Sequence, residues 1–258
     1  MIHLLMTGFL TVLTQVGGII YLISIVLFRK FSLLKKTLAG ILLYLICVFL
    51  IVPFFAKFGN REPLPLTGKI APYTVFTCLQ NRHYVSTKTK TTLESVSKKF
   101  SLQYPESRIF YLDANFPFFD GFPLFPHLSH SDGKKLDLAF YYKNDNVPVN
   151  KSASFIGYGF YEGPIGKEIN YAAICRRKGF WQYGFIGKLI PMRNQELYSV
   201  DETRTRRLIQ LLNNASGTDK IFLEPHLQTR WKLHALRKIR FHGCHAVRHD
   251  DHIHWQIH

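Results

Sequence analysis

The sequence predicts an α+β fold in which a small antiparallel sheet flanked by helices follows a two-helix transmembrane hairpin. Two observations support this fold. One is a pair of long apolar runs near the N-terminus, and the other is a succession of short strand and helix patterns from residue 107 onward. We divide the chain into the hairpin at 1–57, a linker and N-terminal subdomain at 58–106, and a larger domain at 107–258.

The two apolar runs cover residues 4–28 and 38–55, and each approaches the roughly 20 residues that cross a bilayer as a helix. Residues 29–36 between them carry four basic side chains, which the positive-inside rule keeps in the cytoplasm. Both ends of the hairpin and the domain should then lie outside the cytoplasm. A cleaved signal peptide fits poorly, because the first run is long and lacks a basic start. A buried helical hairpin of a soluble protein is the remaining alternative.

In the larger domain, alternating apolar and polar residues indicate strands. Leu136 and Leu138, for example, should lie on the face of a strand opposite to Asp137. The expected elements are strands at 108–112, 135–142, 221–224 and 252–257, a helix capped by Asp201, and a helix around Trp231.

The chain has a formal net charge of +16, which favours anionic partners such as lipid head groups or wall polymers. We consider nucleic acid an unlikely partner, because charge alone favours it and no nucleic-acid-binding motif accompanies that charge. The four cysteines form no Cys-x-x-Cys pair, which disfavours a thiolate zinc site. In an exported domain, two of Cys78, Cys175 and Cys244 can pair in a disulfide, and the sequence does not select which two.

Two histidine-rich motifs carry the expected chemistry: His127-x-x-His130-x6-Asp137 and His249-Asp-Asp-His252-Ile-His254. In a strand, the period of two places His252 and His254 on one face. If the strand that carries Asp137 pairs with the last strand, Asp137 meets His254. Two imidazoles and one carboxylate hold a zinc ion and leave its fourth position open for water, as hydrolysis requires.

The other residues of these motifs have supporting roles in this hypothesis. His252 is placed to handle protons and charge during hydrolysis, with His249 as a second catalytic candidate. His127 is a further candidate ligand or a contact to the substrate. Asp250 or Asp251 can orient an imidazole through its second nitrogen.

The motifs resemble those of the zinc peptidase family that groups lysostaphin-type enzymes, D-Ala-D-Ala carboxypeptidases and the hedgehog fold, and most of all the penicillin-insensitive murein endopeptidases. His127, His130 and Asp137 match the first motif of those endopeptidases, and the second motif matches from His249 to His254. The resemblance implies one zinc ion held by His130, Asp137 and His254. It also implies hydrolysis of peptidoglycan peptides that contain D-amino acids. Lys134, Lys135 and the membrane hairpin depart from the pattern of these endopeptidases.

The sequence thus suggests a zinc peptidase in the bacterial inner membrane, with its catalytic domain on the periplasmic or extracellular side. One alternative is a membrane-tethered domain that binds wall polymers or lipids and keeps a degenerate or structural zinc site. A zinc amidase or esterase is a third possibility. The aromatic run at 116–125 is expected to be a groove wall that receives a peptide, or else core or membrane-facing surface.

Overall fold

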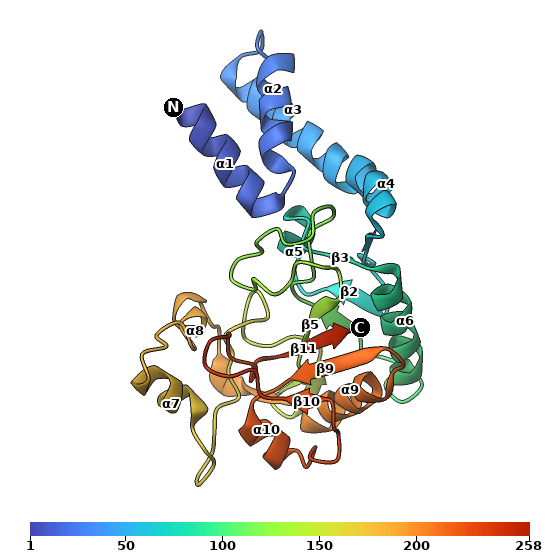
Figure 1. Cartoon of the computed structure of the whole chain (residues 1–258), viewed down its shortest axis with the longest axis vertical. Helices are drawn as coiled ribbons and strands as arrows, with labels where there is room; N and C mark the ends of the chain where they lie inside the picture. The colour runs from blue at the N-terminus through green and yellow to red at the C-terminus, as the bar shows by residue number, and fades with distance from the viewer.

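The computed structural model describes residues 1–258 except for the side chain of Ile186. Apolar helices form the N-terminal part, and a mixed α/β domain with several small sheets follows (Figure 1). The N-terminal elements are α1 (Ile2–Thr14), α2 (Gly17–Leu27), α3 (Leu33–Ile46), the π-helical turn η1 (Cys47–Ile51), α4 (Val52–Ala56) and the 3-10 turn η2 (Lys57–Gly59).

The first apolar run does not form the single span that we expected. The chain reverses at Gln15, whose φ of 66° lies in the left-handed region, and Thr14 Oγ1 accepts a hydrogen bond from the Gly17 amide at 2.8 Å. A Cβ atom on Gly18 would lie only 2.0 Å from Thr11 Oγ1, so glycine lets α2 pack closely against α1. At 1.5 Å per residue, each helix is at most about 20 Å long, short of the roughly 30 Å hydrocarbon core.

The second apolar run lies in a continuous helix from Leu33 to Gly59, formed by α3, η1, α4 and η2. Among the described residues, it is the one helix long and apolar enough to cross a membrane. Pro53 lies two residues after the π-helical segment. A proline ring clashes with the carbonyl four residues earlier, here that of Phe49 inside this segment, which explains the local widening of the helix.

The main sheet has six strands in the order β10-β9-β11-β5-β4-β2. Its centre is antiparallel, as expected, but β10 pairs with β9 and β2 pairs with β4 in parallel. The strands are β2 (Ile70–Pro72), β4 (Ile109–Tyr111), β5 (Lys135–Ala139), β9 (Thr218–Phe222), β10 (Ile239–Arg240) and β11 (His252–Ile257). The smaller sheets are β1 (Glu62–Pro63) with β3 (Tyr84–Val85), and β6 (Tyr142–Asn144) with β7 (Val147–Val149) and β8 (Tyr198–Val200).

Helices α6 (Thr87–Ser101) and α9 (Glu202–Asn214) bury their apolar residues in the main core, with Leu136, Leu138 and Trp255 from the sheet. Asp201 caps α9 as predicted, because its carboxylate accepts from the Arg204 amide at 3.1 Å. The remaining helices are α5 (Val75–Leu79), α7 (Tyr171–Arg177), α8 (Ile186–Leu189), the 3-10 turn η3 (Gln195–Leu197) and α10 (Pro225–Arg230).

Residues 58–106, expected to be a linker and a subdomain, contribute β2 and α6 to the same sheet and core as residues 107–258. The stretch 59–65 is an ordered connection rather than a loose linker, since Arg61 and Leu64 are buried.

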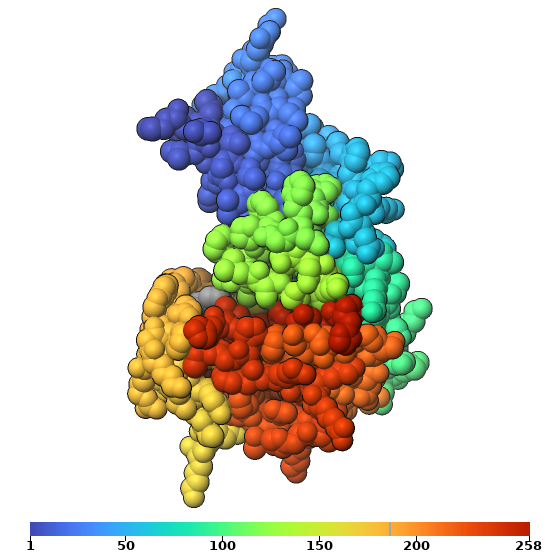
Figure 2. Space-filling model, viewed as in Figure 1, coloured from blue at the N-terminus to red at the C-terminus, as the bar shows by residue number. Residues whose placement is uncertain are grey.

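The domain contacts the helices directly at their α1–α2 turn. The Phe118 amide donates to Gln15 Oε1 at 2.9 Å, and Asn81 Nδ2 donates to the Thr14 carbonyl at 3.2 Å. In Figure 2, the segment around residues 110–130 lies between these helices and the C-terminal part of the domain. The N-terminus points away from the domain (Figure 1), and not toward it as the two-span hairpin would require.

Candidate metal centre

The sheet register brings the two histidine-rich motifs together. His254 on β11 is the direct antiparallel partner of Asp137 on β5. Because side chains alternate along a strand, Leu136, Leu138, Ile253 and Trp255 enter the core while Asp137 and His254 share the opposite face. His130, on the loop before β5, completes the group, and all three residues are buried. This buried group can hold a metal ion.

The spacing of the three donor atoms fits a tetrahedral ion. His130 Nε2 lies 3.1 Å from His254 Nδ1 and 3.3 Å from Asp137 Oδ1, and His254 Nδ1 lies 2.8 Å from the same oxygen. Ligands at about 2.0–2.1 Å from a tetrahedral zinc ion are about 3.3 Å apart. The three separations are thus within about 0.5 Å of a coordinating arrangement.

Hydrogen bonds outside the triad orient its ligand atoms. His130 Nδ1 donates to the Ala114 carbonyl at 2.7 Å, which leaves the lone pair of Nε2 facing Asp137. Tyr158 donates its hydroxyl proton to Asp137 Oδ2 at 2.8 Å and accepts from the Asp113 amide at 3.0 Å. Burial alone would raise the pKa of Asp137, but the neighbouring imidazoles of His130, His252 and His127 hold this pKa well below its usual range.

The turn between His130 and Asp137 depends on Gly133. Its φ of 75° favours glycine, and a Cβ atom there would lie 2.5 Å from an Arg61 guanidinium nitrogen. Asn115 accepts from the Gly133 amide at 3.0 Å and donates to the Lys135 carbonyl at 2.8 Å. These contacts fix the start of β5, and with it the position of Asp137.

His127 and His252 lie beside the other carboxylate oxygen, with Asp137 Oδ2 3.6 Å from His127 Nδ1 and 3.7 Å from His252 Nε2. His127 Nδ1 is hydrogen-bonded to Asp113 at 2.9 Å, and His252 Nδ1 to Asp251 at 2.5 Å. The Nε2 atoms of both rings are buried without a hydrogen-bond partner among the described residues. Both rings are therefore held through one nitrogen while the other is kept available, and these two histidines with Asp137 form a second group that can bind a metal.

The carboxylates also set the charge of His252. Burial by itself would lower the pKa of this imidazole, but Asp137 and Asp251 raise it to about 9. Of the two predicted orienting carboxylates, Asp251 takes this role, whereas Asp250 pairs with Arg248.

His249 is in the same buried cluster but outside both metal-binding groups. Its ring centroid is 5.1 Å from that of His252 and 5.5 Å from that of His254. Burial and the neighbouring His252 and His254 hold the pKa of His249 well below its usual range, so its imidazole is neutral.

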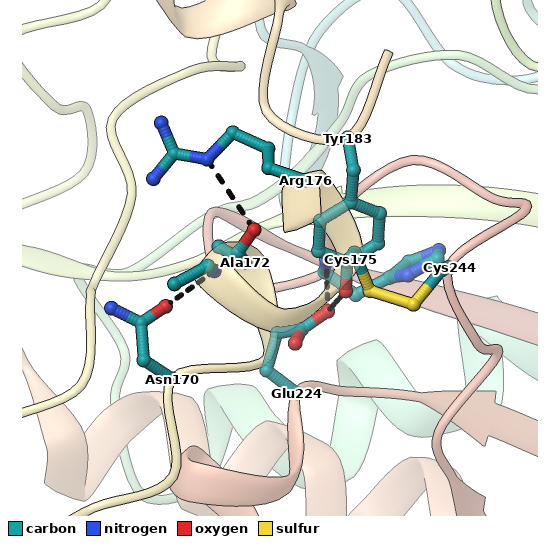
Figure 3. Close-up of a disulfide and its surroundings, with 9 residues drawn as sticks. Asn170, Ala172, Cys175, Arg176, Tyr183, Glu224 and Cys244 are labelled. Atoms are coloured by element: carbon teal, nitrogen blue, oxygen red, sulfur yellow. Dashed lines mark hydrogen bonds between the residues drawn. A yellow bond between two sulfur atoms is a disulfide. The ribbon is translucent and has the colours of Figure 1, made fainter. Parts of the chain in front are cut away.

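A cavity of about 440 Å³ opens beside the metal centre. Its lining joins site residues to apolar side chains, namely His127, His249 and His254 with Leu128, Trp181 and Phe185. The Cys175–Cys244 disulfide ties α7 to the loop that precedes His249, and Tyr183 donates a hydrogen bond to Glu224 nearby (Figure 3). The disulfide is one of the pairs that the sequence left open, and it braces one wall of the cavity.

Sequence reasoning missed two important contacts of the centre. Tyr158 lies in a glycine-rich loop, and the Ala114 carbonyl carries no side-chain signal at all. Asp113, which holds His127, lies outside both histidine-rich motifs.

No protein-family model matches this sequence, and no curated protein matches it either. The candidate metal centre therefore rests on its own geometry: three convergent donor residues, two further imidazoles and an adjoining cavity.

Proposed function

We propose that this protein is a membrane-anchored zinc peptidase that hydrolyses peptide bonds in peptidoglycan. The observation that carries the proposal is the convergence of His130, Asp137 and His254 on donor spacings that suit a tetrahedral ion. Nitrogen and carboxylate donors in this number are typical of catalytic zinc sites, which keep one position free. The likeness of both motifs to murein endopeptidases supports the choice of substrate.

A zinc ion held by these three residues would lower the pKa of a water molecule and polarise the carbonyl of the scissile peptide bond. His252 complements that chemistry. Asp251 fixes its Nδ1, and its buried Nε2 has no hydrogen-bond partner in the described part of the protein, so a protonated ring can donate from Nε2 to the negative charge that develops on the carbonyl oxygen. The same proton can then pass to the departing amine.

His127 and His249 complete the polar part of the cleft. Asp113 holds His127 so that its Nε2 is free to contact the substrate, and the neutral ring of His249 can donate or accept a hydrogen bond. Trp181, Phe185 and Leu128 are exposed and offer an apolar surface to small side chains of a wall peptide.

Location outside the cytoplasm has two supports. The disulfide between Cys175 and Cys244 suits an oxidising compartment. The helix Leu33–Gly59 follows a basic segment, which favours a cytoplasmic start and an external end for this helix. The domain then belongs on the periplasmic or extracellular side of the bacterial inner membrane.

A second candidate is a tethered domain that holds anionic wall polymers or lipids, favoured by the net charge of +16. Such a domain would keep its metal without needing His252.

The test uses the full-length protein in detergent, with metal analysis and chromatography of digested peptidoglycan. We expect close to one zinc ion and released muropeptides from the unsubstituted protein, and loss of both in His254→Ala. His252→Ala should keep the metal and lose about 100-fold or more of the rate. His234→Ala, which changes an exposed histidine, is the control and should resemble the unsubstituted protein. Bound zinc with an unchanged muropeptide profile would favour the binding domain.

A further inference from the structure

The aromatic segment at residues 116–128 joins the metal centre to the N-terminal helices. Phe118 packs against Val16, Ile20, Val52 and Ala56 of these helices, and its amide donates to Gln15 Oε1. The same segment ends at His127 and Leu128, which line the cavity beside the metal centre. The segment thus contacts the helices at one end and the cleft at the other.

The depth of this contact in the membrane follows from the lysines at the two ends of the spanning segment. Lys36 and Lys57 enclose residues 37–56, which are about the 20 residues that a hydrocarbon core requires. Lysines beside such a stretch place their ammonium groups among the lipid head groups. Val52 and Ala56 therefore lie at the outer boundary of the hydrocarbon, and so does Phe118, which packs on them.

Apolar side chains at this level are exposed. Phe119, next to Phe118, is 68% exposed, and the helix presents Phe54, Phe55 and Phe58 just before it ends. On α5, Val75 and Phe76 are exposed as well, and Phe155 lies 5.8 Å from Phe76 between ring centroids. Helix α5 lies deeper along the spanning helix than Phe119 does, because the Tyr44 hydroxyl, 12 residues before Ala56, donates to the Leu79 carbonyl at 2.5 Å.

The connection between the spanning helix and the domain is short. The helix ends at Gly59, and the first strand of the domain begins at Glu62. Arg61 between them is buried, packs on Gly133 and forms an ion pair with Asp120. A domain joined in this way cannot move away from the surface at which the helix emerges.

We propose that the 116–128 segment rests in the outer interface of the bilayer and that α5 lies beside the spanning helix below this level, with Phe119 and Phe76 among the lipids. The occupant of this apolar face is the bilayer itself, because the face is continuous with a helix suited to cross it. The metal centre then works at the membrane surface, on wall peptides that are still attached to lipid or lie against the membrane. This inference rests on the membrane anchoring in the proposed function but not on its metal chemistry.

The test is tryptophan quenching by brominated lipids in the full-length protein, reconstituted in vesicles of phosphatidylethanolamine and phosphatidylglycerol. Phe119→Trp and Phe76→Trp are compared with Leu102→Trp, after subtraction of the emission of the unsubstituted protein. Leu102 is exposed and follows α6, whose first residue, Thr87, bonds to Asn60 at the helix exit. The 15 residues of α6 therefore carry Leu102 about 22 Å from that point.

We expect the added emission to fall at least twofold with lipids brominated near the head group for Phe119→Trp and with lipids brominated along the acyl chain for Phe76→Trp. Neither lipid should change Leu102→Trp appreciably. Equal, weak quenching at all three positions overturns the proposal, provided that Leu42→Trp in the spanning helix is quenched. If Leu42→Trp is not quenched either, the membrane anchor itself is wrong. Quenching at Phe119 that persists in a His254→Ala background while hydrolysis is absent supports the surface placement independently of the peptidase.

Discussion

His254 lies directly opposite Asp137 in the central strand pair, and their side chains approach to 2.8 Å although 117 residues separate them in the chain. Both side chains are buried, and their mutual hydrogen bond or a shared cation offsets part of the cost of removing them from water. The pair therefore ties the folding of the sheet to the formation of the metal centre, and several outcomes can be measured.

Metal removal should lower thermal stability. An ion that binds only the folded state stabilises it by about 2.7 kcal/mol at a concentration 100 times its Kd. For a chain of this size, that corresponds to a rise of about 5–10 °C in melting temperature. Scanning fluorimetry of chelator-treated protein, with and without added zinc, measures this shift. His254→Ala should show no zinc-dependent rise, and an equal rise in that variant would contradict the assigned ligand.

Tyr158→Phe should weaken metal binding without unfolding the protein. The variant removes the hydroxyl that donates to Asp137 Oδ2 and leaves the aromatic packing in place. Loss of such an outer hydrogen bond typically lowers metal affinity about 10- to 100-fold. Competition with a zinc-binding dye measures the affinity. Tyr171→Phe, on α7 outside the centre, is the matched control, and equal affinities of the two variants would argue against a role for Tyr158.

Glu224→Gln should change how stability depends on pH. Burial and the nearby Asp250 raise the pKa of Glu224 to about 7, so the folded protein binds this proton more tightly than the unfolded chain. The resulting stabilisation is complete below about pH 4.5 and is lost as the pH rises through about 7. Glutamine keeps the acceptor for Tyr183 and never ionises.

The glutamine variant should therefore match the unsubstituted protein at pH 5 and exceed it at pH 8, by up to about 3 kcal/mol. Denaturant titrations at the two pH values measure this difference. The exposed Glu106→Gln should follow the unsubstituted protein at both. If the Glu224→Gln protein is less stable than the unsubstituted protein at pH 8, the prediction that ionised Glu224 destabilises the fold is wrong.

Removal of the disulfide should destabilise the domain and loosen the cleft wall. The bond joins residues 69 positions apart, and a loop of this length contributes about 4 kcal/mol through the entropy of the unfolded chain. Cys175→Ser/Cys244→Ser should therefore melt about 8–16 °C lower. Cys47→Ser, which changes a free cysteine, should melt normally. An unchanged melting temperature in the double variant would mean that the bond does not form.

The sequence was sufficient for the strand face that carries Asp137 and His254 and insufficient for the N-terminal apolar helices. The period of two in a strand correctly placed Asp137 opposite Leu136 and Leu138, because burial of one strand face is encoded by every second residue. In the apolar run at 4–28, apolar residues follow one another without a periodic pattern. The hydrophobicity therefore did not show where one helix ends and the next begins. The break was marked only by Gln15 and by the glycines at 17 and 18.

The parallel pairing at the two edges of the main sheet could not be predicted from the sequence either. Strands β2 and β10 have only three and two residues, too few to show an alternation. The hydroxyl of Tyr158 reaches Asp137 through tertiary packing across 21 residues, a contact that no local pattern encodes.

Arg61 carries a consequence for engineering and for evolution. Arg61 immediately precedes the first strand and lies two residues past the end of the long apolar helix, and its guanidinium fills the space above Gly133 and pairs with Asp120. The N-terminal helices and the domain that carries the candidate metal centre are therefore not interchangeable modules. A chimaera that grafts a foreign helix onto this domain must retain this arginine and its spacing from Gly59, or the turn that presents Asp137 loses its support.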